Sequence, residues 1–132
     1  MGSSLRQLQQ GGGSVPDSGL FIGWGETVRG REAEAVETFN ATVEYFAGLQ
    51  ADGAIESFEP VFLEQHGGDL NGFFFVRGDA EQLASLRFDP DFEDVILRAS
   101  LIVDKIGVVG AATGARLERQ MSTFIEAVAQ FA

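Results

Sequence analysis

The feature that most constrains the fold is a run of three phenylalanines, Phe73 to Phe75, in the segment IESFEPVFLEQHGGDLNGFFFVRG, residues 55–78. This segment predicts two β-strands joined by a glycine-rich turn at 66–72, because the turn residues tolerate positive φ and the flanks are rich in apolar side chains. Successive side chains of a strand point to opposite faces of a sheet. The second strand therefore carries large aromatic side chains on both faces, and we expect both faces to be covered.

The alternation also divides the second strand into two sets of side chains. Phe74 and Val76 share one face, and Phe73, Phe75 and Arg77 share the other. One set is expected to meet the helices of the chain itself, and the other to meet the interior of a barrel. The pattern leaves open which set does which, although Arg77 favours the barrel side for its own set, where a strand-end arginine could reach a carboxylate.

The remaining periodicities complete an α+β pattern. The sequence predicts strands at 20–28 and 105–110, and helices from 31 to about 51, at 80–87, at 90–102 and at 114–131. The order β-α-β-β-α-β with a closing helix is that of a ferredoxin-like sandwich with a four-stranded antiparallel sheet. The helices would cover one face of the sheet, and no element is left for the other. We therefore expect a homodimer in which two sheets pack face to face as a dimeric α+β barrel.

The chain divides into an N-terminal tail and one domain. Residues 1–18 are rich in Gln, Gly and Ser with few apolar anchors, which predicts a mobile tail, and residues 19–132 form the barrel domain. No window holds the roughly 18 apolar residues of a membrane span, and no signal peptide is visible. We expect a cytoplasmic protein.

Charge and composition exclude several classes of function. The net charge is −11 with one lysine, Lys105, which disfavours nucleic acid and anionic membrane as partners. The absence of cysteine excludes disulfides, thiolate zinc sites and thiol nucleophiles. The only histidine, His66, cannot by itself make a histidine metal site, so we predict no metal site. No phosphate-binding glycine motif is present, and we expect no cofactor.

Two stretches of the chain carry a resemblance to known proteins. The segments GWGETVRGREAEAVETFNATVEYF, from residue 23, and GGDLNGFFFVRGD, from residue 67, look like a group of small bacterial proteins of unassigned function. Over about 20–131, the order and lengths of the elements resemble the dimeric α+β barrel superfamily. That superfamily includes antibiotic-biosynthesis monooxygenase-like, EthD-like and stress-responsive barrel proteins. The resemblance implies a fold and a dimer, and no catalytic motif transfers residue by residue.

The residues that could form a small-molecule site are few. Trp24 and Glu26 lie two apart on one predicted strand, so we expect them to share a face, and a carboxylate beside an aromatic wall in an apolar cavity could move protons. Glu26 and His66 are the candidate acids or bases, and Arg77 could instead hold Glu26 in a structural ion pair. The expected ligand-binding set is Trp24, Glu26, His66, Phe73, Phe75 and Arg77.

Three functions remain open from the sequence. The first is a homodimer that binds a small apolar or aromatic metabolite without a cofactor. The second is a cofactor-independent enzyme, monooxygenase-like or isomerase-like, that uses a cavity carboxylate or His66 as acid or base. The third is a purely structural homodimer. No acid, base and nucleophile converge in the sequence, so we rank the binding protein first.

Overall fold

The computed structural model describes residues 15–131 of the 132-residue chain. Its strands form one antiparallel sheet in the order β2-β3-β1-β4. The elements follow the order β1 (Ser18–Trp24), α1 (Glu32–Ala51), β2 (Ser57–Phe62), β3 (Gly72–Gly78), α2 (Ala80–Arg87), α3 (Pro90–Ser100), β4 (Gly107–Ala112) and α4 (Gly114–Gln130). This is the ferredoxin-like α+β fold that the sequence predicted, with β1 in the centre of the sheet beside β3.

The ends of the predicted elements differ from the observed ones at two strands. β1 begins at Ser18 and ends at Trp24, earlier than the predicted strand, and β4 is shifted two residues towards the C-terminus. Most of the predicted tail lies outside the described residues. Ser18, which was assigned to that tail, is 3% exposed and opens β1.

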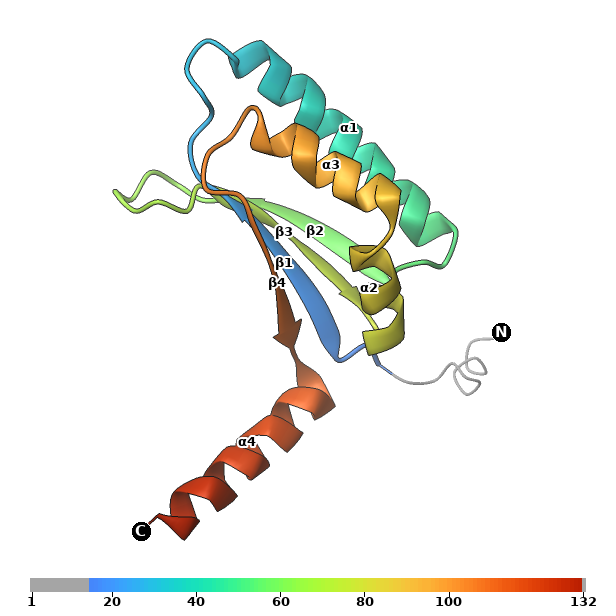
Figure 1. Cartoon of the computed structure of the whole chain (residues 1–132), viewed down its shortest axis with the longest axis vertical. Coiled ribbons are helices and arrows are strands. Elements are labelled where there is room, and N and C mark those ends of the chain that lie inside the picture. Colours follow the sequence, from blue (N-terminus) through green and yellow to red (C-terminus); the bar gives the residue numbers. More distant parts are fainter. Residues whose placement is uncertain (1–14, 132) are drawn as a thin grey trace.

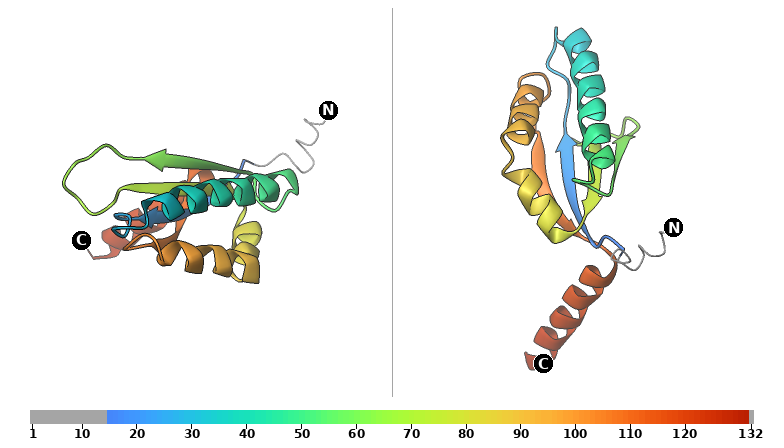
Figure 2. Two further views of the ribbon diagram at one scale, coloured as in Figure 1. Left: turned by 90° about the horizontal axis from the view of Figure 1, so that it is seen from above. Right: turned by 90° about the vertical axis from the view of Figure 1, so that its right-hand side faces the viewer.

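One face of the sheet is covered by α1, α2 and α3, and α1 and α3 lie side by side across it (Figures 1 and 2). Phe74 and Val76 of β3 point to this face and are 4% and 0% exposed. They are therefore the set that meets the helices, as the position of Arg77 in the other set suggested. The core on this face consists of Leu20, Ile22, Phe46, Ile55, Phe74, Val76, Leu83, Leu86 and Phe92.

Local sequence signals fix where α2 and α3 begin. Asp79 accepts a hydrogen bond from the Gln82 backbone N–H, and the Gln82 side chain accepts one from the Asp79 N–H, which makes a reciprocal capping box. Asp89 caps α3 through the Asp91 N–H, and Pro90 occupies the first helical position. These caps turn the chain back over the sheet, and so they set α3 against the same face as α1.

The other face of the sheet, which we call the open face, is covered by no helix within residues 15–131. The rings of Phe21 and Phe73 lie 4.8 Å apart on it, and Arg77 lies over the ring of Phe75 at 4.7 Å. Arg77 also pairs with Glu59 of β2 at 3.5 Å. The open face is thus aromatic at its centre and charged at one edge.

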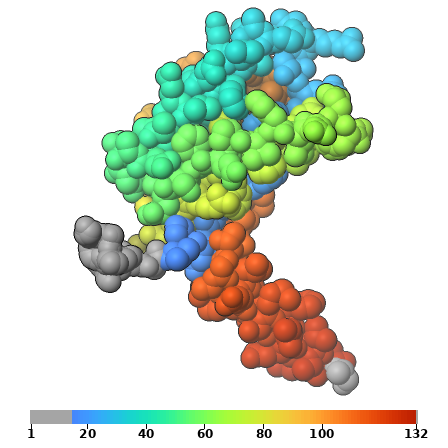
Figure 3. Space-filling view, turned by 180° about the vertical axis from the view of Figure 1, so that it is seen from behind, coloured from blue at the N-terminus to red at the C-terminus, as the bar shows by residue number. Residues whose placement is uncertain are grey.

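The last helix does not close the fold. α4 leaves the end of β4 and projects away from the sheet (Figures 1 and 3). Arg116, in its first turn, donates to Ser18 Oγ and to the Ala111 carbonyl, both at 3.2 Å. The apolar stripe beyond this anchor is exposed, from 46% at one end to 90% at the other, and consists of Leu117, Met121, Phe124, Ile125, Val128 and Phe131. The sequence predicted a closing helix at 114–131, and α4 forms there without joining the layer of helices over the sheet.

Candidate functional site

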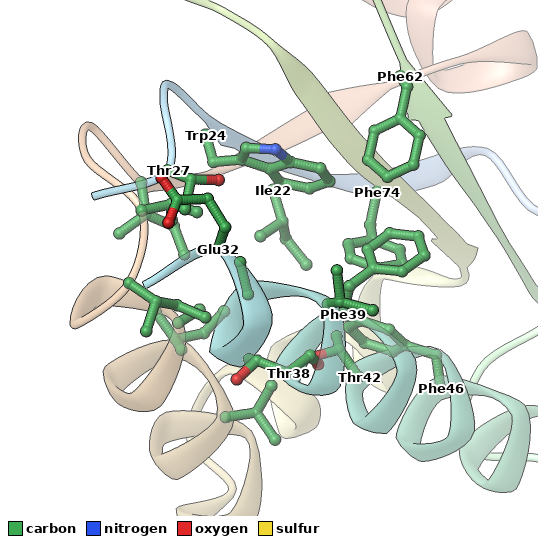
Figure 4. A pocket seen from close by; sticks show the side chains of 18 residues that line it. Ile22, Trp24, Thr27, Glu32, Thr38, Phe39, Thr42, Phe46, Phe62 and Phe74 are labelled. Atoms are coloured by element: carbon green, nitrogen blue, oxygen red, sulfur yellow. The ribbon is translucent and has the colours of Figure 1, made fainter. Parts of the chain in front are cut away.

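A cavity of about 470 Å³ lies between the sheet and the helices α1 and α3. Several elements contribute to its wall, because β1, β2 and β3 form the floor, α1 and α3 form the roof, and the segment from 102 to 106 closes one side (Figure 4). The lining residues are Ile22, Trp24, Thr27, Glu32, Ala35, Val36, Thr38, Phe39, Thr42, Phe46, Phe62, Phe74, Val95, Ile96, Ala99, Ile102, Val103 and Ile106.

An aromatic cluster forms one wall of the cavity. The indole of Trp24 lies edge-on to the rings of Phe39 and Phe62, at 6.5 Å and 6.2 Å between centroids. Phe39 stacks on Phe74 at 5.5 Å and lies 4.9 Å from Phe62. Aromatic rings at these distances and angles stabilise one another beyond the burial of their area. The wall presents both edges and faces of aromatic rings to the cavity.

Polar groups in the lining are few, and they come mainly from α1. Thr38 and Thr42 lie one turn apart on α1, and the Thr42 hydroxyl donates to the Thr38 carbonyl at 2.7 Å. Glu32, in the first turn of α1, accepts a hydrogen bond from the Gly30 N–H at 3.3 Å. Its carboxylate and the Thr27 side chain lie beside each other near Trp24 (Figure 4). The cavity is thus apolar with one acidic end.

The structure places Trp24 in this cavity and leaves Glu26 outside it. β1 ends at Trp24, so the alternation that would put Trp24 and Glu26 on one face stops before Glu26. The backbone at Glu26 instead pairs with Asp104: its N–H donates to Asp104 Oδ1 at 2.6 Å, and its carbonyl accepts from the Asp104 N–H at 2.9 Å. Glu26 is exposed and does not line the cavity.

The other predicted site residues are on the far side of the sheet or in a loop. Phe73, Phe75 and Arg77 lie on the open face, opposite Trp24, and Arg77 pairs with Glu59 rather than with Glu26. The predicted set is therefore divided between two faces of one sheet. Because Phe74 alternates with its two neighbours, it is the residue of the phenylalanine run that lines the cavity.

His66 is exposed in the loop between β2 and β3, and both of its ring nitrogens bond within that loop. The Gly68 N–H donates to Nδ1 at 3.2 Å, which leaves Nε2 as the protonated nitrogen that donates to the Leu70 carbonyl at 2.8 Å. The ring does not line the cavity. In this conformation His66 holds the loop together.

Sequence reasoning missed the cavity residues of α1 because helical periodicity describes a stripe without showing where it leaves space. Phe39 and Phe46 lie on α1, and the small residues Ala35 of α1 and Ala99 of α3 leave the cavity open beside them. Glu32 was not among the predicted site residues. The signal that could have identified Glu32 as a site residue was its position one helical turn before Ala35 and Val36, on the same side of α1.

Two classes of site are not found in the part of the chain that the structure describes. No group of three or more His, Cys, Asp or Glu residues there could hold a metal ion. None of the helices between residues 15 and 131 is long and apolar enough to cross a membrane.

Comparison with known proteins bears on the fold. No protein-family model matches the chain, and no curated protein sequence matches it. Among solved structures, it is similar to a dimeric protein of unknown function with a ferredoxin-like fold from Bacteroides fragilis. The identity is 13% and the TM-score 0.54, over 72% of this chain and 95% of that one. The chain is also similar to SnoaB, a cofactor-independent oxygenase from Streptomyces nogalater, with 17% identity and a TM-score of 0.46 over 76% of this chain and 94% of SnoaB.

At these identities the first likeness shows the fold alone. It confirms the ferredoxin-like architecture that the order of elements predicted, and at the level of fold it supports the resemblance to the dimeric α+β barrels.

Proposed function

We propose that this protein is a homodimer that binds a small apolar or aromatic molecule, without a cofactor, in the cavity between the sheet and the helices α1 and α3. The observation that carries the proposal is the cavity itself, about 470 Å³ with an aromatic wall. Sites for small molecules are concave, mostly apolar spaces of about 300–1,000 Å³ with a few polar groups. Filling such a space removes apolar surface from water, which contributes about 25 cal/mol per Å².

A blocking substitution tests the binding site. Ala99 lines the cavity from α3, so Ala99→Phe should fill the space and abolish binding of naphthylmethanol, measured by isothermal titration calorimetry. Ala84→Phe on α2 is the matched control, because Ala84 is exposed and does not line the cavity. Ala35→Leu provides a smaller obstruction from α1 if Ala99→Phe fails to fold. Equal binding by wild type and both cavity variants would contradict the site, as would no binding by wild type.

The homodimer is proposed because two apolar surfaces lack cover within residues 15–131. The open face presents the half-buried rings of Phe21, Phe73 and Phe75, and the stripe of α4 presents exposed residues such as Phe124, which is 62% exposed. Large exposed apolar patches mark interaction sites. A second copy supplies the same two surfaces, and the Bacteroides fragilis protein that shares the fold is dimeric. Packing two open faces together would make the barrel, with the α4 stripe available to the partner.

An enzyme that moves a proton on the same class of molecule is the second candidate. The observation that favours it is Glu32, a carboxylate at the end of an apolar cavity, where it could act as a general base. Incubating the protein with candidate carbon acids in deuterated water would reveal deuterium incorporation by mass spectrometry. Deuterium incorporation that is lost when Glu32 is replaced would support the enzyme. Binding without deuterium incorporation would favour the protein that only binds its ligand.

A further inference from the structure

We propose that the cavity selects planar aromatic molecules that carry an ammonium group, and that Glu32 binds this group. The inference rests on the proposed function, since it names the chemical class of the molecule that occupies the same cavity. It is carried by the charges in the lining, by the hydrogen-bonding state of Glu32 and by the place of Glu32 beside the aromatic wall.

Glu32 is the only ionisable side chain among the 18 residues that line the cavity. A carboxylate or sulfonate on the guest would enter without an arginine, lysine or histidine to pair with it, and burying an unpaired charge is costly. The chain as a whole carries a net charge of −11, which repels anions and attracts cations at long range. A cationic guest meets a carboxylate of opposite charge, so the lining discriminates by charge.

The Glu32 carboxylate has acceptor capacity left for a guest. It accepts one hydrogen bond, from the Gly30 N–H at 3.3 Å, and forms no ion pair within residues 15–131. The neighbouring cation, Arg31, is held elsewhere, because its guanidinium pairs with Glu34 and donates to the Leu101 carbonyl at 3.4 Å. An ionised carboxylate has about four acceptor sites, so an ammonium N–H can bind beside the existing bond.

The position of Glu32 suits a guest that is aromatic at one end and cationic at the other. Glu32 lies at the same end of the cavity as Trp24, whereas Phe46 lies towards the other end (Figure 4). A ring system seated along Phe39 and Phe74 would direct a short amine arm to Glu32. There the ammonium would also lie close to the Trp24 indole, whose face attracts cations.

The test uses three probes with one ring system and different charge: naphthylmethylammonium, naphthylmethanol and naphthoate. Titration calorimetry on wild type should give the ammonium probe an affinity roughly three- to tenfold higher than the neutral probe, as expected for a partly exposed charge pair. Naphthoate should bind more weakly than the neutral probe. Glu32→Gln should remove the preference, so that the ratio of the affinities of the ammonium and neutral probes falls to about one.

Glu44→Gln is the matched control, because Glu44 is an exposed residue of α1 that does not line the cavity, and the net charge changes equally. Retention of the preference in Glu44→Gln, with its loss in Glu32→Gln, supports the inference. Equal affinity of the ammonium and neutral probes for wild type would overturn it while leaving the proposed function intact. Failure of naphthylmethanol itself to bind wild type would overturn both.

Discussion

The ring of Phe75 lies directly over the backbone of Gly19 on the open face, so closely that a β-carbon at position 19 would overlap Cζ of the ring. Gly19 pairs with Arg77 across β1 and β3, and the Arg77 guanidinium lies over the same ring at 4.7 Å. The absence of a side chain at Gly19 thus leaves the space that the end of the Phe75 ring occupies.

Replacing Gly19 with alanine should lower the free energy of unfolding by about 1–2 kcal/mol, because the Phe75 ring must lift off the sheet. Chemical denaturation measures the change. Gly107→Ala is the matched control: Gly107 lies in β4 on the same face, and a β-carbon added there would have no atom within 4 Å. Equal destabilisation by the two substitutions would show that ring overlap is not the cause.

The protein should have the mass of a dimer in multi-angle light scattering at micromolar concentration. Phe124→Asp should shift the mass towards that of a monomer, because it places a charge in the exposed stripe of α4. Ser122→Asp, on the opposite side of the same helix, should leave the dimer intact. A monomer mass for the wild type would contradict the barrel. A dimer mass for both variants would show that α4 is not part of the dimer interface.

Tyr45, the only tyrosine, should titrate at unusually high pH. Burial, together with the negative charges of Asp89 and Asp91, raises the pKa of Tyr45 from 10.0 to about 12. Its hydroxyl is buried and has no hydrogen-bond partner within the described residues. The ultraviolet absorption of the phenolate in the folded protein measures this pKa directly, and a midpoint at the ordinary value would contradict the packing around α3.

The same group should make stability depend on alkaline pH. The folded state keeps the phenol proton to higher pH than the unfolded chain, so the contribution is complete below pH 10.0 and is lost as the pH rises towards about 12. The loss should be modest because the side chain is only half-buried. In Tyr45→Phe this part of the loss of stability should be absent when the free energy of unfolding is compared at pH 10.0 and at about pH 12.

Phe74→Ala should cost about 3–5 kcal/mol of unfolding free energy, because Phe74 is 4% exposed and contacts Trp24, Phe39 and Phe46. Phe88→Ala is the control, since Phe88 is 81% exposed after α2 and should change stability little. Denaturant unfolding monitored by circular dichroism compares them. A small cost at Phe74 would contradict the observed register of β3.

The sequence predicted the fold where local patterns determine the outcome. The alternation of Phe73 to Phe75 predicted a strand with aromatic side chains on both faces, and the periodicity after residue 90 predicted the helix there, because these signals act within a few residues. What packs against α4 could not be predicted, because an apolar stripe on a helix does not specify its packing partner. Glu26 was placed with Trp24 by strand alternation, which fails where β1 ends and the backbone turns to pair with Asp104.

The position of Glu32 shows the same limit for the site. Its place near the start of a helix was clear from sequence, but the space in front of it arises from how α1, α3 and the sheet pack together. A cavity is a property of tertiary packing, and segments far apart in the chain define this one.

The most direct test of the account is to observe Trp24, the only tryptophan, while a ligand binds. Its indole N–H gives a single nuclear magnetic resonance signal from the cavity wall. We predict that naphthylmethanol shifts this signal saturably in the wild type and in Ala84→Phe, and that the shift is lost in Ala99→Phe. An indole signal that stays fixed at ligand concentrations that saturate calorimetric binding would contradict a site in this cavity.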